Sequence, residues 1–328
     1  MQTRELGNTG VQLPAIGLGC MSMNHGYGEP NDTESIATLQ YAIDLGITFW
    51  DTADIYANGK NEELIAKLLK PNRNKIFIAT KFGFEMYTGG KFTGVNGTPA
   101  YLKTAVEGSL KRLQTDVIDL YYLHRIDPAV PVEDTVGAMA NLVKEGKVRY
   151  LGLSEASPNS IRKAHSVHPI AALQSEYSLL TRDVEAAILP LCRELKIGFI
   201  PFSPLARGLV TNTLDIATLK EGDFRKSLPR YQAAYADNNK SLAEGLAQIA
   251  KQKNCMPSQL ALAWVLAQGD HIIPIPGTKR RVYLKENAGA LDVAITPADS
   301  EKIETLLKQF PNTGERYNEA NKQFVDRS

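Results

Sequence analysis

Short apolar runs that alternate with longer segments of helical periodicity limit the fold of this sequence most strongly. Eight runs have the length of strands, and most are apolar throughout rather than at alternate positions. Strands of that kind are typical of a parallel sheet that is buried on both faces. The expected strands are residues 16–20, 49–53, 76–81, 118–124, 150–154, 171–177, 199–203 and 272–276.

The segments between these runs repeat apolar residues every three or four positions, as amphipathic helices do. In residues 100–113, for example, Leu102, Val106, Leu110 and Leu113 recur at that spacing. Helices are also expected over residues 35–45, 133–145, 183–196 and 257–268. A glycine follows each of these four at or near its end, as helix C-termini prefer.

Repeated strand and helix units form either an open doubly wound sheet or a closed (β/α)8 barrel. Eight strands without a duplicated half favour the barrel. We therefore expect an α/β fold, a single (β/α)8 TIM-barrel domain over residues 1–328 with an N-terminal β-hairpin around residues 7–10. Long loops over residues 85–97 and 206–239 are expected on its C-terminal face, either as walls of a site or as surface insertions.

Charge and cysteine content exclude several classes of function. With 37 basic and 36 acidic residues the formal net charge is +1, so neither nucleic acid nor an anionic membrane is an expected partner. The three cysteines have no metal-ligand spacing, so no disulfide framework and no metal site are expected. A secretory signal and an apolar run of about 18 residues are also lacking. The expected location is the cytoplasm.

Polar residues suited to acid/base chemistry occur at the ends of three consecutive predicted strands. Asp51 lies at one strand end with Tyr56 in the loop after it, while Lys81 and His124 end the next two strands. Singly, such a lysine could be a structural ion pair and such a histidine a satisfied core residue. Because neighbouring strands are about 5 Å apart, all four should share one pocket. There Lys81, held by Asp51, would lower the pKa of Tyr56.

These four residues would protonate a carbonyl group as a hydride arrives, with His124 hydrogen-bonded to the carbonyl oxygen, but they supply no hydride. In chain order and local sequence the set resembles the catalytic tetrad of the aldo-keto reductase family. The resemblance extends over nearly the whole chain, from residues 17–19 to the final helical segment. The sequences LHRID at 123–127 and IPGTK at 275–279 resemble the bacterial and plant branches of that family.

The resemblance implies a nicotinamide dinucleotide bound across the barrel mouth without a Rossmann domain. Lys279 and Arg280 precede a predicted helix start, which suits a 2′-phosphate. NADPH/NADP+ is therefore the expected cofactor. The alternative is that these basic residues form only a solvated surface. By resemblance, Ser154 and Gln174 hold the nicotinamide carboxamide and Phe202 stacks on its ring. The other implied contacts are Gly19, Ser203, Leu205, Arg207, Gly277, Thr278, Lys279, Arg280, Glu286 and Asn287.

Two positions depart from the pattern of the family. Tyr283 stands where many relatives carry an arginine, and Glu155 follows Ser154 where the aldose reductase branch has asparagine. Neither change touches the tetrad.

The sequence therefore predicts an NADPH-dependent reductase of a small aldehyde or ketone, acting as a monomer or weak oligomer, with Tyr56 as the general acid. One alternative is an NADP(H)-binding regulatory or scaffold protein of the same fold. Another is a phosphate-handling barrel isomerase or lyase, in which Lys81 would act without the dinucleotide.

Overall fold

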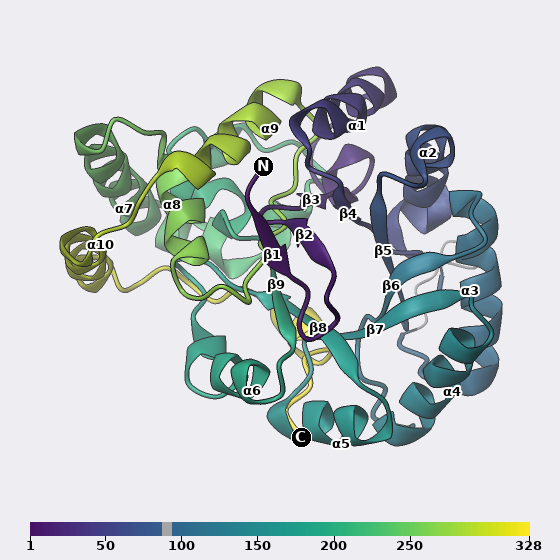
Figure 1. Ribbon diagram of the computed structural model, residues 1–328. Coiled ribbons are helices and arrows are strands. Elements are labelled where there is room, and N and C mark those ends of the chain that lie inside the picture. Colours follow the sequence, from purple (N-terminus) through teal and green to yellow (C-terminus); the bar gives the residue numbers. More distant parts are fainter. Residues whose placement is uncertain (87–93) are drawn as a thin grey trace.

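The computed structural model describes residues 1–86 and 94–328, which form two sheets (Figure 1). A hairpin of β1 (Thr3–Glu5) and β2 (Gln12–Pro14) comes first, as expected. Seven strands follow within the described residues, and each pairs in parallel with the next along the chain. They are β3 (Leu18–Gly19), β4 (Phe49–Asp51), β5 (Phe77–Phe82), β6 (Ile118–Leu123), β7 (Val148–Ser154), β8 (Ile170–Glu176) and β9 (Gly198–Phe202).

The eighth predicted strand, residues 272–276, links β9 back to β3 without forming a regular strand. The amides of residues 273 and 275 donate to β9 at 2.9 and 3.0 Å, and those of residues 17 and 19 donate to the carbonyls of Pro274 and Pro276 at 2.9 and 3.3 Å. Because proline has no N–H, the two prolines cannot donate toward β3, and that side of the ladder is half complete. These bonds close the expected (β/α)8 barrel.

Helices surround the strands (Figure 1). Side-chain caps start several of them, since Asn31, Thr98 and Ser157 each accept a bond from a backbone amide three residues later. Among the described residues, no helix has both the length and the apolar character that are needed to span a bilayer. The helices are α1 (Asp32–Leu45), α2 (Lys60–Leu69), α3 (Pro99–Leu113), α4 (Val132–Lys144), α5 (Pro158–Val167), α6 (Ile188–Glu194), α7 (Ala233–Gln252), α8 (Pro257–Leu266), α9 (Arg281–Ala288), α10 (Pro297–Gln309) and α11 (Glu319–Lys322).

Two further predicted segments differ from the structure. The single helix expected over residues 183–196 is a 3-10 turn, Asp183–Glu185, followed by α6. Pro190 explains the break, because it cannot donate to the carbonyl of residue 186 and its ring crowds that group. The loop expected over residues 206–239 is shorter in the structure, because α7 begins at Ala233. Within the other expected loop, residues 87–93 lie outside the described residues.

The N-terminal hairpin closes one end of the barrel. Leu6 and Leu13 pack into the apolar cluster that fills the barrel interior, together with Phe49 and Tyr122. Arg4 donates hydrogen bonds to the carbonyls of residues 266, 269 and 272 at 2.9, 2.7 and 2.5 Å. A cation that satisfies three carbonyls at one end fixes the hairpin there. The C-terminal ends of the strands form the opposite end, where barrel enzymes place their chemistry.

Inside the barrel, β6 and β7 pack closely at one glycine. Tyr122 is opposite Gly152 in the strand register and is fully buried. A Cβ atom at position 152 would lie 2.4 Å from the Tyr122 ring. The absence of a side chain at position 152 therefore makes room for the tyrosine.

The substitution Gly152→Ala tests this packing. We expect a loss of about 1–3 kcal/mol in the free energy of unfolding, because the new methyl group overpacks the interior. The matched control is Gly137→Ala in α4, where a Cβ atom meets nothing within 4 Å. It should stabilise the protein by about 0.5–1 kcal/mol through helix propensity. Urea unfolding followed by circular dichroism measures both, and an unchanged midpoint for Gly152→Ala would contradict the packing argument.

Candidate active site

The C-terminal ends of β4, β5 and β6 bring the four predicted acid/base residues together. Asp51 ends β4, Lys81 lies in β5, and His124 directly follows β6. Tyr56 begins the 3-10 helix η2 (Tyr56–Gly59) in the loop after β4. Backbone bonds continue beyond the strand ends, from the amide of residue 54 to the carbonyl of Lys81 at 3.2 Å and from that of His124 to residue 82 at 2.7 Å. The parallel hydrogen bonding of the sheet therefore continues into the first residues of these loops.

A buried ammonium group lies at the centre of this site. The Lys81 side chain is fully buried and donates hydrogen bonds to Asp51 Oδ1 and, at 2.7 Å, to the carbonyl of Thr52. Its Nζ lies 5.2 Å from the centre of the Tyr56 ring. Gln174 donates to the second oxygen of Asp51 at 2.8 Å. Asp51 thus holds Lys81 beside Tyr56, and Gln174 orients Asp51.

The net pKa shift of Tyr56 is opposite to the one expected from the sequence. Burial raises the pKa of Tyr56 above its ordinary value, and the nearby charge of Lys81 lowers it only in part. For Lys81, burial lowers the pKa, but Asp51 and Tyr56 together outweigh burial and raise it. Tyr56 is therefore protonated and Lys81 charged at neutral pH. A phenol in that state can donate its proton.

His124 is a neutral imidazole in this environment. Burial lowers its pKa well below the ordinary value, and the charges of Arg125 and Lys81 lower it further. Its ring lies edge-on to Tyr56 at 6.0 Å and to Phe84 at 4.8 Å between centroids. Among the described residues, its buried Nδ1 has no hydrogen-bond partner. A neutral imidazole carries one N–H and can donate a single hydrogen bond to a carbonyl oxygen.

The predicted nicotinamide contacts lie on the neighbouring strands. Ser154 ends β7, and its Oγ accepts a bond from Arg125 Nη1 at 3.2 Å. Gln174 lies in β8 and Phe202 ends β9. The register aligns Ser154 with Gln174. The order of the strands therefore brings these three residues to the same end of the barrel as the tetrad.

The loop after β9 has a strained backbone. Ser203, Ala206 and Arg207 have φ values of 49°, 46° and 54°, and Gly208 has 101°. Left-handed conformations cost residues other than glycine of order 1–3 kcal/mol each and concentrate at binding sites. Successive amides in such a loop can face an anion. This loop also contains Leu205, another of the predicted cofactor contacts.

The segment after the eighth strand contains the other predicted contacts. Gly19 and Gly277 form a parallel bridge, and a Cβ atom on Gly19 would lie 2.8 Å from the carbonyl of Ile275, so the close approach requires glycine. Thr278 accepts a bond from the amide of Arg280 at 3.1 Å. The Arg280 guanidinium lies 5.9 Å from the Tyr283 ring.

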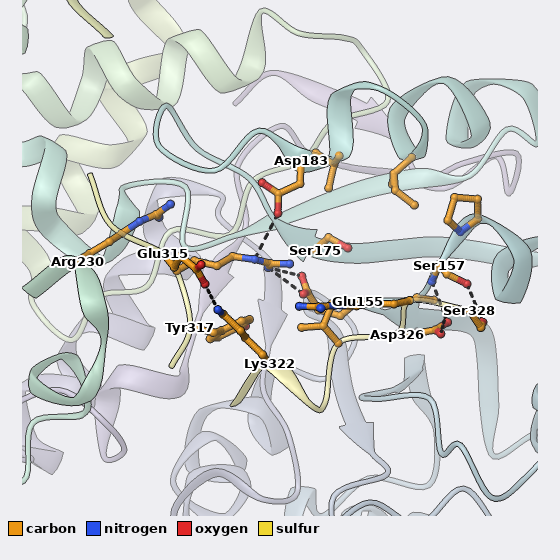
Figure 2. Close-up of a pocket in the computed structure, with 17 residues that line it drawn as sticks. Glu155, Ser157, Ser175, Asp183, Arg230, Glu315, Tyr317, Lys322, Asp326 and Ser328 are labelled. Carbon is orange, nitrogen blue, oxygen red and sulfur yellow. Dashed lines mark hydrogen bonds and ion pairs between the residues drawn. The ribbon is translucent and has the colours of Figure 1, made fainter. Parts of the chain in front are cut away.

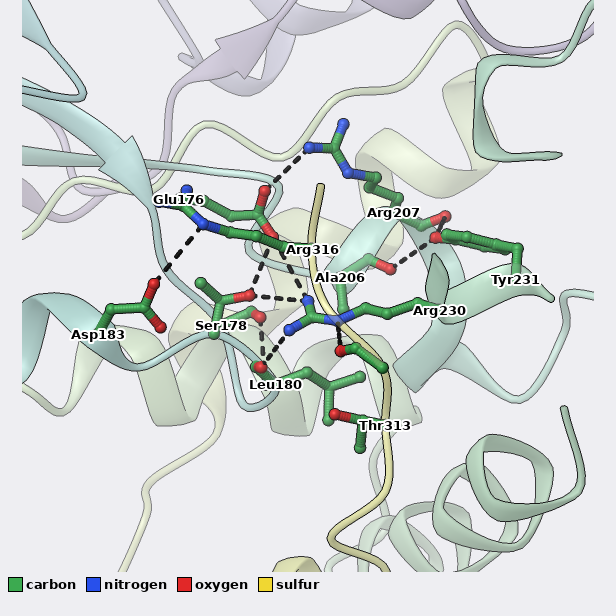
Figure 3. Close-up of polar contacts among 12 residues, drawn as sticks. Glu176, Ser178, Leu180, Asp183, Ala206, Arg207, Arg230, Tyr231, Thr313 and Arg316 are labelled. Carbon is green, nitrogen blue, oxygen red and sulfur yellow. Dashed lines mark hydrogen bonds and ion pairs between the residues drawn. The ribbon is translucent and has the colours of Figure 1, made fainter. Parts of the chain in front are cut away.

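Three predicted cofactor residues are held by other protein groups. Arg207 donates to Glu176 at 2.9 Å (Figure 3). It also donates to Tyr27 Oη at 3.1 Å. Lys279 Nζ donates to the carbonyls of Tyr27 and Glu29 at 2.7 and 2.6 Å. Glu286 accepts a bond from Ser258 of α8, and Asn287 is buried. The loop after β3 thus contacts Lys279, one of the two cations that were expected to meet a 2′-phosphate.

Sequence reasoning missed a charged network beside the barrel mouth. Glu155 pairs with Arg316 at 2.8 Å (Figure 2), and Glu176 pairs with Arg207 and with Arg230, at 2.9 and 3.5 Å (Figure 3). Burial opposes ionisation of Glu155, but Arg316 and Arg125 hold its pKa below the ordinary value. The departure at position 155 was visible in the sequence, whereas its distant partner was not.

The C-terminal segment supplies that partner and anchors beside α5. Asp326 accepts a bond from the amide of Ser157 at 2.9 Å, and Ser328 contacts the hydroxyl of Ser157 at 3.2 Å (Figure 2). Ser328 also contacts the hydroxyl of Ser160 at 3.2 Å. A cavity of about 490 Å³ lies between this segment and the ends of β7 and β8. Among the described residues, its lining includes none of the tetrad. It is a space beside the candidate active site.

The fold and the site agree with the known proteins that resemble this chain. The sequence model of the Aldo/keto reductase family matches residues 15–308. This chain belongs to the aldo/keto reductase family. It is 45% identical over 319 residues to probable aldo-keto reductase 1 from Glycine max, across 97% of this chain and 92% of that protein.

Solved structures of aldo-keto reductases share the whole fold. A glycerol dehydrogenase from Gluconobacter oxydans has a TM-score of 0.86 at 26% identity, over 94% of this chain and 95% of its own. The holo form of an aldo-keto reductase from Bacillus halodurans has a TM-score of 0.79 at 31% identity, over 93% and 96%. The family resemblance seen in the sequence is confirmed. Aldo-keto reductases are oxidoreductases that use nicotinamide cofactors, so the chain belongs to that class of enzyme.

The substitution Lys81→Met tests the buried ion pair. It leaves the Asp51 carboxylate without its cation, and we expect a loss of about 3–5 kcal/mol in the free energy of unfolding. Adding Asp51→Asn should recover part of this loss, because the unpaired charge is removed with its partner. The control is Arg281→Ala, which removes an exposed pair with Glu34 worth about 0–1 kcal/mol. Equal effects of Lys81→Met and Arg281→Ala in denaturant unfolding would rule out this view of the pair.

Proposed function

We propose that this chain reduces an aldehyde or ketone to the alcohol with NADPH, with Tyr56 as the proton donor. The observation that carries the proposal is the charged, fully buried Lys81 between Asp51 and Tyr56. A lysine ammonium beside a phenol stabilises the phenolate that remains after proton transfer. A structural ion pair alone has no need of the tyrosine.

The polar groups around the barrel mouth suit a nicotinamide carboxamide. Ser154 Oγ accepts from Arg125, which leaves the serine proton to donate to the carboxamide oxygen. Gln174 uses its amide nitrogen on Asp51, which leaves its amide oxygen as an acceptor for the carboxamide NH2 group. Phe202 offers an aromatic face from the end of β9. When bound there, the cofactor supplies the hydride.

The residues of the chain then hold the substrate and move one proton. The neutral His124 donates a hydrogen bond to the carbonyl oxygen and orients it toward Tyr56. Tyr56 gives its proton to that oxygen as negative charge develops on it. Lys81 stabilises the resulting phenolate, and Asp51 keeps Lys81 charged and in place. This is proton donation assisted by a nearby fixed charge.

The substitution Tyr56→Phe removes the proposed proton donor. We expect turnover of a simple aldehyde to fall about 10²- to 10⁴-fold, the usual contribution of a general acid. NADPH binding, measured by quenching of protein fluorescence, should be retained because the phenylalanine keeps the aromatic ring. Equal turnover by the two proteins would reject the role of Tyr56. Tight NADPH binding without turnover by wild type, over a panel of aldehydes and ketones, would favour a regulatory or scaffold protein.

The pH profile of the wild type provides a control for this experiment. Reduction requires the protonated phenol, so the rate is level below the pKa of Tyr56 and falls above it. Because burial raises that pKa above its ordinary value of about 10, the rate should remain level through neutral and mildly alkaline pH. A decline near neutrality in saturating NADPH would identify another group as the acid.

We also propose that Lys279 and Arg280 select NADPH over NADH. Both precede α9 and carry the charge that a 2′-phosphate requires. Lys279→Met and Arg280→Met should each raise the KM for NADPH about tenfold or more, since a charge-assisted bond is lost. The KM for NADH, which lacks the phosphate, should change little. Arg149→Met, which alters an exposed arginine of β7 paired with Asp119, is the control. Parallel changes for both cofactors would contradict the assignment.

A further inference from the structure

A second histidine lies against the proposed proton donor. His25, in the loop between β3 and α1, stacks on Tyr56 with 5.9 Å between ring centroids and 18° between ring planes. His124 meets the same tyrosine edge-on, at 6.0 Å and 83°. Tyr56 is therefore flanked by two imidazoles, and the acid/base argument above uses only His124.

The loop that carries His25 is held in place on its N-terminal side by a buried amide. Asn61, in the first turn of α2, donates to the Asn24 side chain at 2.6 Å and to the carbonyl of Cys20 at 3.0 Å. The oxygen of Asn61 accepts from Thr52 Oγ1 at 2.6 Å, and the carbonyl of Thr52 accepts from Lys81. One side chain thus connects the His25 loop to the group that binds Lys81.

The other side of the loop is fixed as well. The amide of Phe224 donates to the carbonyl of Gly26 at 3.0 Å, and Arg207 donates to Tyr27 Oη at 3.1 Å. Arg225 lies 5.0 Å from the centre of the Tyr27 ring. His25 therefore lies between two anchored residues, Asn24 and Tyr27, and its position relative to Tyr56 is determined by hydrogen bonds.

The His25 ring has two nitrogen atoms that can form hydrogen bonds and that stacking on Tyr56 does not require. Burial lowers its pKa below the ordinary value, so the ring is neutral and offers one N–H donor and one nitrogen acceptor. Within residues 1–86 and 94–328 neither ring nitrogen has a hydrogen-bond partner, although the residue is half-buried. A phenylalanine would stack equally well. The two ring nitrogens are thus left to bind a ligand.

We infer that His25 is a specificity-determining residue that hydrogen-bonds a second oxygen of the substrate, on the carbon next to the reacting carbonyl. The inference rests on the proposed reductase function, in which Tyr56 and His124 take the carbonyl oxygen. His25 lies against the ring of Tyr56, within reach of a group on the carbon next to that carbonyl. A neutral donor and acceptor suits a hydroxyl or carbonyl group. The substrates are accordingly α-hydroxy or α-oxo aldehydes and ketones.

A matched pair of substrates tests this role. Glyceraldehyde carries the α-hydroxyl group, and propanal has the same carbon chain without it. In His25→Phe, which keeps the stacked ring and removes both nitrogens, kcat/KM for glyceraldehyde should fall about 10- to 100-fold, because a site built around a substrate hydroxyl loses its partner. The value for propanal should stay within about threefold, and the KM for NADPH should not change.

The variant His25→Gln is the second arm, because it restores a donor and an acceptor without the ring. It should regain part of the activity toward glyceraldehyde. Equal losses for both substrates in His25→Phe, or no loss for either, would overturn the inference and leave the reductase proposal intact. If wild type turns over neither substrate and no other carbonyl compound, the proposed function fails and the inference fails with it.

Discussion

The buried ammonium group of Lys81 is the constraint on which the site depends. An isolated charge in the interior is costly, so it persists only where opposite charge and hydrogen-bond acceptors surround it. Asp51 and the carbonyl of Thr52 satisfy that need. Gln174 in turn orients Asp51 from β8. The burial of one cation therefore links the C-terminal ends of β4, β5 and β8.

The other buried charges around the barrel mouth are also paired with opposite charges. Glu155 and Glu176 are almost completely buried at the ends of β7 and β8, and each is paired with arginine. Their partners Arg207 and Arg316 belong to segments distant in the chain, the loop after β9 and the C-terminal segment. Figure 1 shows the C-terminus beside α5, where Asp326 accepts a bond from the backbone of Ser157. Ion pairing thus joins the ends of the strands to the segments that cover them.

The fold and the tetrad could be predicted because both depend on local sequence patterns. Apolar runs give the strands, and a polar residue at the end of a run gives a position at the barrel mouth. Other features depend on longer-range contacts. The pairing of Glu155 with Arg316 spans 161 positions, and no local pattern encodes it. The pKa of Tyr56 was expected to fall because Lys81 is adjacent, but the dehydration of the phenol has the larger effect.

Proline has two different effects in this chain. Pro190 divides a predicted helix. Pro274 and Pro276 occupy alternate positions of the closing segment, on the side that faces β3, and the amides of residues 273 and 275 donate to β9. A slip of one residue would turn the prolines toward β9 and eliminate the bonds at 2.9 and 3.0 Å. The prolines therefore fix the register of the last segment. Thr278, Lys279 and Arg280 follow Pro276 after a single glycine. By fixing the register, the two prolines therefore also fix the position of the two basic residues relative to the barrel mouth.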